Sequence, residues 1–255
     1  MAYLYAIKTN GREGLKHGHL EMEAMVRVDT KTEKVIEDIA LRNCTFVFRD
    51  RDHAGEKLAE KLKGYKKSEA YVLAIPAGGV PVGFILSKRL RLHFDVILVR
   101  KIHIPWNREA GFGAISWDGV ILFNEPLLRS LGLTEEEINS CIEEEKEDIT
   151  KRMRLFRGDN PFPDLRDKTV ILVDDGIASG FSMLAAIESV RRRDVKEIVV
   201  AVPTGSENAV SLVEPHVDKL VCLNIRTGPI FAVADAYKAW RDLKEDDIMK
   251  ILKEE

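Results

Sequence analysis

Residue types and patterns that are scarce in this chain exclude several classes of protein. The 255 residues contain three cysteines, Cys44, Cys141 and Cys222, which are widely spaced and form no CxxC pair. This spacing argues against a disulfide framework or a thiolate zinc site, and it favours a reducing compartment. A formal net charge of −3 indicates no basic surface for a nucleic acid or a membrane. No apolar run has the length of a membrane span or a signal peptide, so we expect a cytoplasmic protein.

Common cofactor and catalytic motifs are also missing. The sequence contains no GxxxxGK[ST], which excludes a P-loop NTPase, and no GxSxG turn of an α/β-hydrolase. The stretch GGVPVG is a near miss of a dinucleotide-binding fingerprint, because its spacing differs and the next strand ends in Arg100 rather than in an acid. His17, His19 and His53 have no acid or cysteine at ligand spacing, so we interpret them as loop and helix residues rather than metal ligands.

The greater part of the chain alternates between buried strands and helices. Strands rich in Val, Ile and Leu are predicted at 70–76, 94–101, 168–174, 197–203 and 219–224. Helices are predicted at 52–64, 79–90, 133–156, 181–192 and 206–214. Asp50 or Asp52 is the expected N-cap of the first helix, and Thr134 with Glu137 forms a capping box on the longest one. This alternation predicts an α/β fold with a doubly wound, mainly parallel five-stranded sheet covered on both faces.

Two regions depart from this alternation. Residues 1–43 contain two predicted strands around a polar turn and no following helix, so we expect an accessory β element there and an α/β domain over 44–255. The Trp117-Asp118-Gly119 turn between apolar runs predicts a hairpin.

The stretch VILVDDGIASGFS, residues 170–182, carries the chemistry. Neither face of a sheet covered on both sides tolerates an unpaired carboxylate, so Asp174 and Asp175 indicate that the strand ends there. Ligands of such sheets bind at the carboxyl ends of the strands. Two carboxylates suit sugar hydroxyls or a hydrated Mg²⁺, and the helix that begins near Ser182 suits a phosphate. The order of these features predicts a ribose 5-phosphate site rather than an ordinary capped turn.

This stretch resembles the signature of the type I phosphoribosyltransferases, which bind 5-phosphoribosyl 1-pyrophosphate (PRPP). The resemblance covers roughly residues 44–240 and includes FRDRDHAGEKLAEKL, RKIHIPWNREAGFGAI and FAVADAY. It is greatest to the group of predicted phosphoribosyltransferases without an assigned base. It implies a flap over about 101–125 and a hood, the segment that covers the base, over about 224–240.

The resemblance also implies roles for individual residues. Asp174 and Asp175 would hold the ribose hydroxyls and the Mg²⁺ shell, and Arg100 with Lys101 would hold pyrophosphate. Phe231, Tyr237 and Trp240 are the aromatic candidates that would stack on the base, and Phe231 is the foremost of them. The PRPP-binding loop comprises Asp174, Asp175, Gly176, Ile177, Ala178, Ser179, Gly180, Phe181 and Ser182, and the pyrophosphate loop comprises Ala77, Gly78 and Gly79.

The implied reaction transfers the 5-phosphoribosyl group from PRPP to a nucleobase or similar nitrogen nucleophile, with Mg²⁺ as cofactor and release of pyrophosphate. A homodimer is expected. Two departures bear on this hypothesis: many family members carry a cation where Ala77 stands, and the 6-oxopurine branch carries an acid where Ala178 stands. Ala178 argues against a hypoxanthine-guanine type of mechanism, and Ala77 favours the alternative, a non-catalytic PRPP-sensing regulator. An oxidoreductase that uses a dinucleotide is a third hypothesis.

Overall fold

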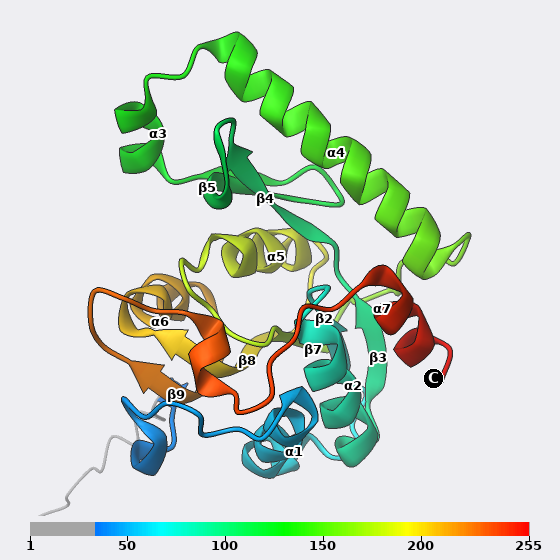
Figure 1. Cartoon of the computed structure of the whole chain (residues 1–255). Helices are drawn as coiled ribbons and strands as arrows, with labels where there is room; N and C mark the ends of the chain where they lie inside the picture. Colours follow the sequence, from blue (N-terminus) through cyan, green and yellow to red (C-terminus); the bar gives the residue numbers. More distant parts are fainter. Residues whose placement is uncertain (1–33, 255) are drawn as a thin grey trace, which may run out of the picture. The chain divides into compact units, whose positions relative to one another are not determined.

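The computed structural model describes residues 34–254, all in the second of two units that comprise residues 1–32 and 33–255. Residues 1–33 and 255 lie outside the described residues, and with them the first predicted strand and the histidines at 17 and 19. The central sheet has six parallel strands in the order β1-β9-β8-β7-β2-β3 (Figure 1). They are β1 (Val35–Ile36), β2 (Tyr71–Ala74), β3 (His93–Val96), β7 (Thr169–Val173), β8 (Glu197–Ser206) and β9 (Lys219–Arg226). The predicted α/β class is confirmed, and the two-residue β1 adds one strand to the five expected.

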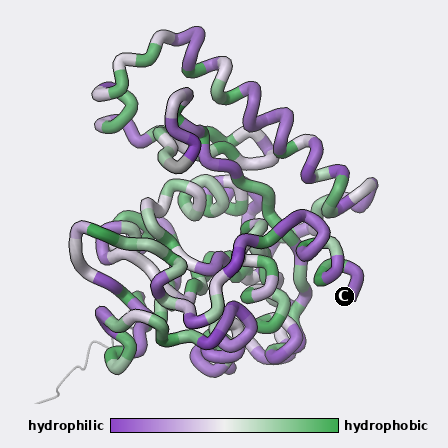
Figure 2. Tube along the Cα trace, viewed as in Figure 1, coloured by the Kyte–Doolittle hydropathy of each residue, from purple (hydrophilic) through white to green (hydrophobic). Residues whose placement is uncertain are grey.

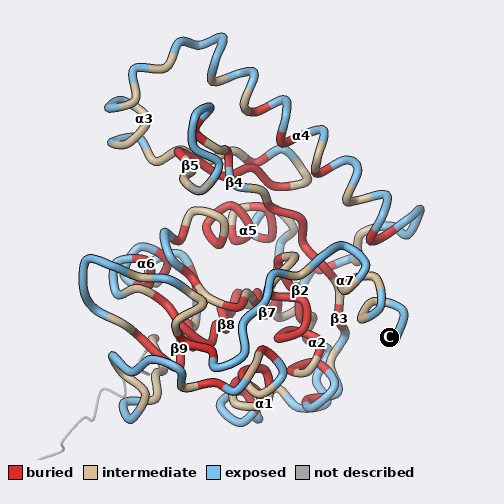
Figure 3. The backbone as a smooth tube through the Cα atoms, viewed as in Figure 1, coloured by how far each residue is buried: buried red, intermediate tan, exposed pale blue. Residues whose placement is uncertain are grey.

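Helices cover both faces of this sheet, as the continuous apolar strands predict. One face carries α1 (Arg51–Lys61) and α2 (Gly79–Leu90), and the other carries α5 (Phe181–Arg191) and α6 (Glu207–Val213). Strand β7 shows the alternation: Ile171 and Val173 pack in the core beneath α1 and α2, whereas Val170 and Leu172 pack beneath α5 and α6. Figure 2 shows apolar residues along the strands, and Figure 3 shows those residues buried.

The helix ends follow the predicted capping chemistry. Asp50 is the N-cap of α1, and its carboxylate accepts the backbone N–H of His53 at 2.8 Å. Helix α4 (Glu135–Arg157) begins with the predicted capping box, in which Thr134 Oγ1 accepts from the N–H of Glu137 and the Glu137 carboxylate accepts from the N–H of Thr134. These caps satisfy N–H groups that the first turn of a helix leaves without partners.

The predicted strand 94–101 is wrong in its extent, because the chain divides it between two sheets. Strand β3 ends at Val96 on the edge of the main sheet, and the chain then enters an antiparallel sheet in the order β4-β5-β6. These strands are β4 (Val99–Ile104), β5 (Asn107–Ser116) and β6 (Ile121–Phe123), with α3 (Glu125–Leu131) following. An edge strand has no second neighbour to hold it, so its continuation is free to pair with β5. The predicted hairpin is confirmed, because β5 and β6 pair on either side of Trp117-Asp118-Gly119.

The C-terminal segment returns to the beginning of α1. Phe48 donates its N–H to the carbonyl of Ala236 at 2.9 Å, and Lys238 donates to the carbonyl of Phe48 at 2.8 Å. Helix α7 (Glu245–Leu252) then packs against α2 and α4. Short 3₁₀ turns complete the described elements: η1 (Ile39–Leu41), η2 (Lys63–Tyr65), η3 (Glu214–His216) and η4 (Val233–Ala236). Among residues 34–254, no helix is both long and apolar enough to cross a membrane.

Candidate functional site

The loop after β7 forms a small cavity at the carboxyl edge of the sheet. Ile177 donates its N–H to the carbonyl of Thr204, and its own carbonyl accepts the N–H of Ser206, both at 3.0 Å. The Ser206 hydroxyl also donates to the carbonyl of Ala178 at 2.8 Å. These bonds fix the loop against the end of β8. The cavity has a volume of about 190 Å³ and is lined by Lys101, Asp174, Gly176, Ile177, Ala178, Ser179, Gly180, Ser182, Met183 and Val233.

The beginning of α5 gives this cavity the character of an anion site. Gly180 is the N-cap with φ of +84°, a left-handed conformation that glycine adopts without a steric penalty, and no side chain caps the helix. An uncapped helix N-terminus offers free N–H groups and the positive end of the helix dipole. Ser182 in the first turn and Lys101 on β4 line the same cavity. The arrangement therefore suits a phosphate monoester.

The two adjacent acids have different surroundings. Asp174 lines the cavity, and its Oδ1 accepts the backbone N–H of Asp175 at 2.8 Å. Asp175 forms an ion pair of 2.8 Å with Nε of Arg51, with both side chains only about one-tenth exposed. Tyr237, which is buried, donates its hydroxyl to the backbone carbonyl of Asp175 at 2.6 Å.

The charge state of the acid pair reflects its burial. Burial raises the pKa of Asp174 well above its ordinary value, the neighbouring Asp175 carboxylate raises it further, and the Arg51 guanidinium lowers it. Burial also raises the pKa of Asp175, while the charge of Arg51 and its hydrogen bond act in the opposite direction. An ionised Asp174 thus lacks a full counter-charge, and hydroxyl donors or a cation at the cavity would stabilise it.

The loop between β2 and α2 packs directly on these acids. A Cβ placed on Gly78 would lie 1.9 Å from Oδ2 of Asp175, and one on Gly79 would lie 2.6 Å from the carbonyl oxygen of Val173. The peptide bond between Pro76 and Ala77 is cis. The N–H of Gly79 donates to the carbonyl of Ile75 at 3.0 Å, so it is engaged within the turn. The structure therefore brings the predicted pyrophosphate loop and the acid pair together.

The predicted basic pair, Arg100 and Lys101, is divided between two faces of β4. Lys101 lines the cavity with Asp174. Arg100 instead forms ion pairs of 3.0 Å with Glu145 and Asp148 on α4. Consecutive residues of a strand point to opposite faces, which explains the division. Lys101 therefore lies at the cavity, whereas the contacts of Arg100 with α4 place it outside, and the predicted binding of pyrophosphate by this pair stays a prediction.

Glu145 is expected to anchor the antiparallel sheet to α4. Its side chain is 6% exposed and binds both Arg100 and Nδ1 of His103, the latter at 2.6 Å. Glu145→Ala removes both bonds, and we expect the free energy of unfolding in urea to fall by about 2 kcal/mol. Glu144→Ala is the matched control, because Glu144 is largely exposed on the same helix and should change stability by less than about 0.5 kcal/mol. Equal effects of the two changes would contradict this role for Glu145.

Aromatic residues of the predicted hood contact arginine side chains of this chain. The ring of Phe231 lies 5.1 Å from the guanidinium carbon of Arg226, and Val233 rather than Phe231 lines the cavity. Base stacking by Phe231 therefore stays a prediction. Trp240 lies beneath the Arg51 guanidinium, with 3.9 Å between the guanidinium carbon and the ring centroid.

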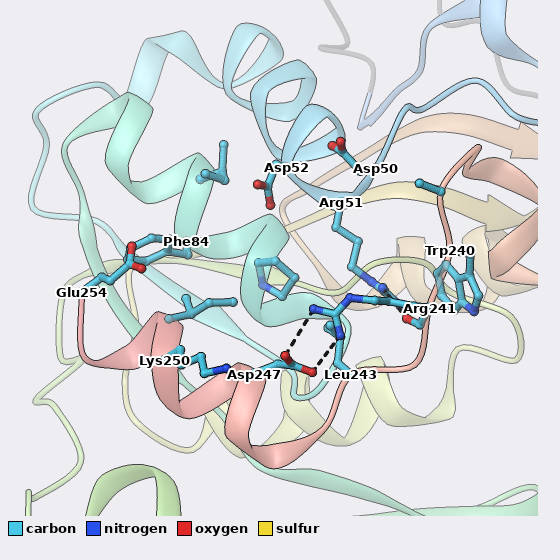
Figure 4. A pocket seen from close by; sticks show the side chains of 14 residues that line it. Asp50, Arg51, Asp52, Phe84, Trp240, Arg241, Leu243, Asp247, Lys250 and Glu254 are labelled. Carbon is cyan, nitrogen blue, oxygen red and sulfur yellow. Dashed lines mark hydrogen bonds and ion pairs between the residues drawn. The ribbon is translucent and has the colours of Figure 1, made fainter.

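Arg51 is the residue that the sequence interpretation missed. It lies in the first turn of α1, where the helix dipole disfavours a cation, and this position is the signal that could have identified it. Its other side faces a second cavity of about 560 Å³, shown in Figure 4. Figure 4 also shows the ion pair between Arg241 and Asp247 at this cavity. No sequence pattern could have identified the cavity, because α1, α2 and α7 form it from distant parts of the chain.

The residues present agree with a Mg²⁺ ion held largely by a substrate. Within residues 34–254, no group of three or more His, Cys, Asp or Glu side chains could form a protein metal site. Mg²⁺ commonly binds through one or two carboxylates together with water and substrate phosphates. Asp174 at the cavity provides such a carboxylate. One carboxylate suits a Mg²⁺ ion that a substrate also binds, and it does not suit an ion held by protein ligands alone.

Comparisons with known proteins identify the family of this chain. The profile of the phosphoribosyl transferase domain family matches residues 50–237. Two proteins of Mycobacterium tuberculosis, MT0597 and Rv0571c, both provisionally named phosphoribosyl transferases, are 32% identical over 206 residues. That alignment covers 81% of this chain but only 46% of each relative, so the chain spans about half their length. The crystal structure of TT1426 from Thermus thermophilus is 33% identical, with a TM-score of 0.66, over 81% of this chain and 98% of that one.

The matched residues 50–237 include the parallel sheet of this chain apart from β1, and the acid pair at its carboxyl edge. The chain belongs to the phosphoribosyl transferase family, and the type I membership predicted from VILVDDGIASGFS is confirmed.

Proposed function

We propose that this protein binds PRPP and transfers its 5-phosphoribosyl group to a nitrogen nucleophile, with a nucleobase as the foremost class of acceptor. One observation carries the proposal: a single cavity joins an acid, a cation and an uncapped helix N-terminus, provided by Asp174, Lys101 and α5. The acid suits the ribose hydroxyls, and the helix suits the 5′-phosphate. The loop at Gly78 lies directly beside the acids, where the pyrophosphate of the same ligand would extend.

The reaction needs positioning more than covalent participation of the protein. The acceptor nitrogen forms a bond to C1 of the ribose while the bond from C1 to the pyrophosphate oxygen breaks, and pyrophosphate leaves with the electron pair. The sugar gains positive charge in the transition state, as in glycoside hydrolysis. Asp174 would hold the ribose hydroxyls, Lys101 would balance phosphate charge, and α5 would fix the 5′-phosphate. Bound Mg²⁺, held by Asp174 directly or through water, would supply charge stabilisation for the leaving pyrophosphate.

The remaining expectations from the sequence belong to this proposal. The antiparallel sheet β4-β5-β6 spans most of the predicted flap over about 101–125 and would shield the reacting carbon from water. A homodimer in the cytoplasm is proposed as well, and light scattering of the purified protein would measure its mass in solution.

A PRPP-sensing protein without catalysis is the second candidate. Ala77 favours it, because a methyl group occupies a position where many family members carry a cation for pyrophosphate. Such a protein would bind PRPP in the same cavity and transfer nothing.

Two measurements in sequence separate these candidates. Calorimetric titration of the wild-type protein with PRPP in the presence of Mg²⁺ is expected to show binding to one site per chain. Pyrophosphate release is then measured with each of the common purine and pyrimidine bases, and a base that gives turnover identifies the enzyme. Binding without turnover for any base would favour the sensor. A folded protein that does not bind PRPP would contradict both candidates.

A further inference from the structure

Arg51 connects the acid pair with the C-terminal segment through three contacts. Its Nε donates to Oδ2 of Asp175 at 2.8 Å, and its Nη1 donates to the carbonyl oxygen of Arg241 at 2.9 Å. Its guanidinium carbon lies 3.9 Å from the ring centroid of Trp240. The Arg51 side chain is 10% exposed, so these contacts hold a nearly buried cation in one position.

We propose that Arg51 is a positioning residue that commits Asp175 to the protein interior and leaves Asp174 as the one acid of the pair that receives the ligand. The assignment of Asp175 rests on contacts within the chain. The identity of the ligand as PRPP rests on the proposed function.

Contacts within the chain surround most of the Asp175 carboxylate, which is only 12% exposed. Asp174 lines the cavity and Asp175 does not. On one side of Asp175 the Gly78 backbone approaches so closely that a Cβ there would lie 2.3 Å from the carboxylate carbon. On another side Arg51 forms the ion pair, and Tyr237 holds the backbone carbonyl at 2.6 Å. Turning the Asp175 carboxylate toward a ligand would leave the Arg51 cation without its counter-charge in a nearly buried place, which is strongly unfavourable.

The same contacts explain why a strand should end in two acids when one faces the ligand. Asp175 pairs with Arg51 at the end of the sheet. Arg51 also donates a hydrogen bond to the backbone carbonyl of Arg241 and stacks on the ring of Trp240. The second acid thus connects Trp240 of the predicted hood and the backbone at Arg241 with the strand end, while the Arg51 cation partly offsets the effect of the Asp175 carboxylate on Asp174. Of the charges on other elements, Arg51 on α1 pairs with Asp175, and Lys101 on β4 lines the cavity together with Asp174.

Four proteins test this division of roles: wild type, Arg51→Met, Asp175→Asn, and the variant with both changes. Arg51→Met leaves the Asp175 charge uncompensated, and we expect the dissociation constant for PRPP with Mg²⁺ to rise at least about 30-fold. Asp175→Asn leaves Arg51 uncompensated and should also weaken binding. The double variant removes both charges, and its dissociation constant should return to within about fivefold of wild type, because neighbouring charges are not additive. A ligand contact by Asp175 would instead leave the double variant as weak as Asp175→Asn, and that result would overturn the proposal.

Two further variants separate positioning from a general loss of structure. Arg49→Met is the matched control, because Arg49 is 67% exposed and pairs with Asp50 at the same helix end, so binding should not change. Arg51→Lys keeps the charge and should bind PRPP better than Arg51→Met, which a purely steric role would not require.

Urea unfolding tests the pairing of Arg51 with Asp175 without PRPP, and therefore independently of the proposed function. If the wild type does not bind PRPP, the proposed function fails, and the urea unfolding of the same four proteins still tests the charge pairing. The double variant should then be more stable than the two single losses together predict. Additive losses would overturn the pairing of Arg51 with Asp175.

Discussion

Gly78→Ala is expected to abolish the binding of PRPP and to lower the free energy of unfolding by about 3 kcal/mol, the upper end for overpacking. The new Cβ would lie 1.9 Å, 2.3 Å and 2.7 Å from Oδ2, Cγ and Oδ1 of Asp175. The carboxylate has little room to withdraw, because Arg51 holds it in a buried ion pair. Gly78 has φ of −63° and ψ of −35°, which alanine adopts readily, so the effect is steric and not conformational. Urea unfolding and calorimetry measure the two losses.

Gly64→Ala is the matched control for this experiment. No atom lies within 4 Å of a Cβ placed on Gly64, and this residue belongs to a 3₁₀ turn distant in sequence from the acids. The change should leave PRPP binding intact and alter stability by less than about 1 kcal/mol, because alanine there reduces the entropy of the unfolded chain. A Gly78→Ala protein that binds PRPP like wild type would show that the loop and Asp175 do not pack as closely as described.

Asp174→Asn is expected to weaken the binding of PRPP with Mg²⁺ at least about 100-fold, since under the proposed function the Asp174 carboxylate accepts charge-assisted hydrogen bonds from the ribose hydroxyls. The same change should raise the free energy of unfolding at pH 7. Burial and the Asp175 carboxylate raise the pKa of Asp174, so the folded chain holds this proton more tightly than the unfolded chain does. The stability of the wild type therefore falls as pH rises from the ordinary aspartate pKa of about 3.9 through the raised value. The asparagine variant lacks that decline and should be more stable than wild type at pH 7.

The control for this prediction is Asp159→Asn. Asp159 is exposed in the loop after α4, and its replacement should change neither binding nor the pH dependence of stability. Calorimetry and urea unfolding at several pH values measure both properties. An Asp174→Asn protein that loses stability at pH 7 and binds PRPP normally would assign Asp174 a structural role and remove the main support for the proposed function.

The two acids should respond differently to replacement. Loss of binding with gained stability is expected for Asp174, whereas Asp175 should show its effect mainly through its partner. In such a site the uncompensated charge of Asp174 destabilises the fold but lies where the ligand binds. The charge of Asp175 is compensated by Arg51 and stabilises the fold.

Much of the fold could be predicted because short-range chemistry determines it. Thr134 and Glu137 form the predicted capping box, and Asp50 caps α1, since these bonds need only residues three positions apart. Continuous apolar strands such as 169–173 predict burial on both faces, which the structure confirms. The boundary at Val96 could not be predicted in the same way, because apolar residues continue through Val99 while the pairing partner changes from β2 to β5. Local pattern carries no information about the partner of a strand.

By itself the sequence determined the family, the strand that ends in two acids and the loop of small residues that follows it. These features are encoded in consecutive residues, where the geometry of a strand and a helix N-terminus determines which groups are exposed. Only the tertiary structure decided which members of each predicted pair face the cavity. Arg100 and Lys101 point to opposite faces of β4, and the packing of α4 and of the cavity decides that Arg100 pairs with Glu145 and Asp148 while Lys101 lines the cavity. Asp175 is withdrawn because Arg51, 124 positions away in the chain, supplies its counter-charge. Contacts between such distant residues depend on how the elements pack, and no local pattern records that packing.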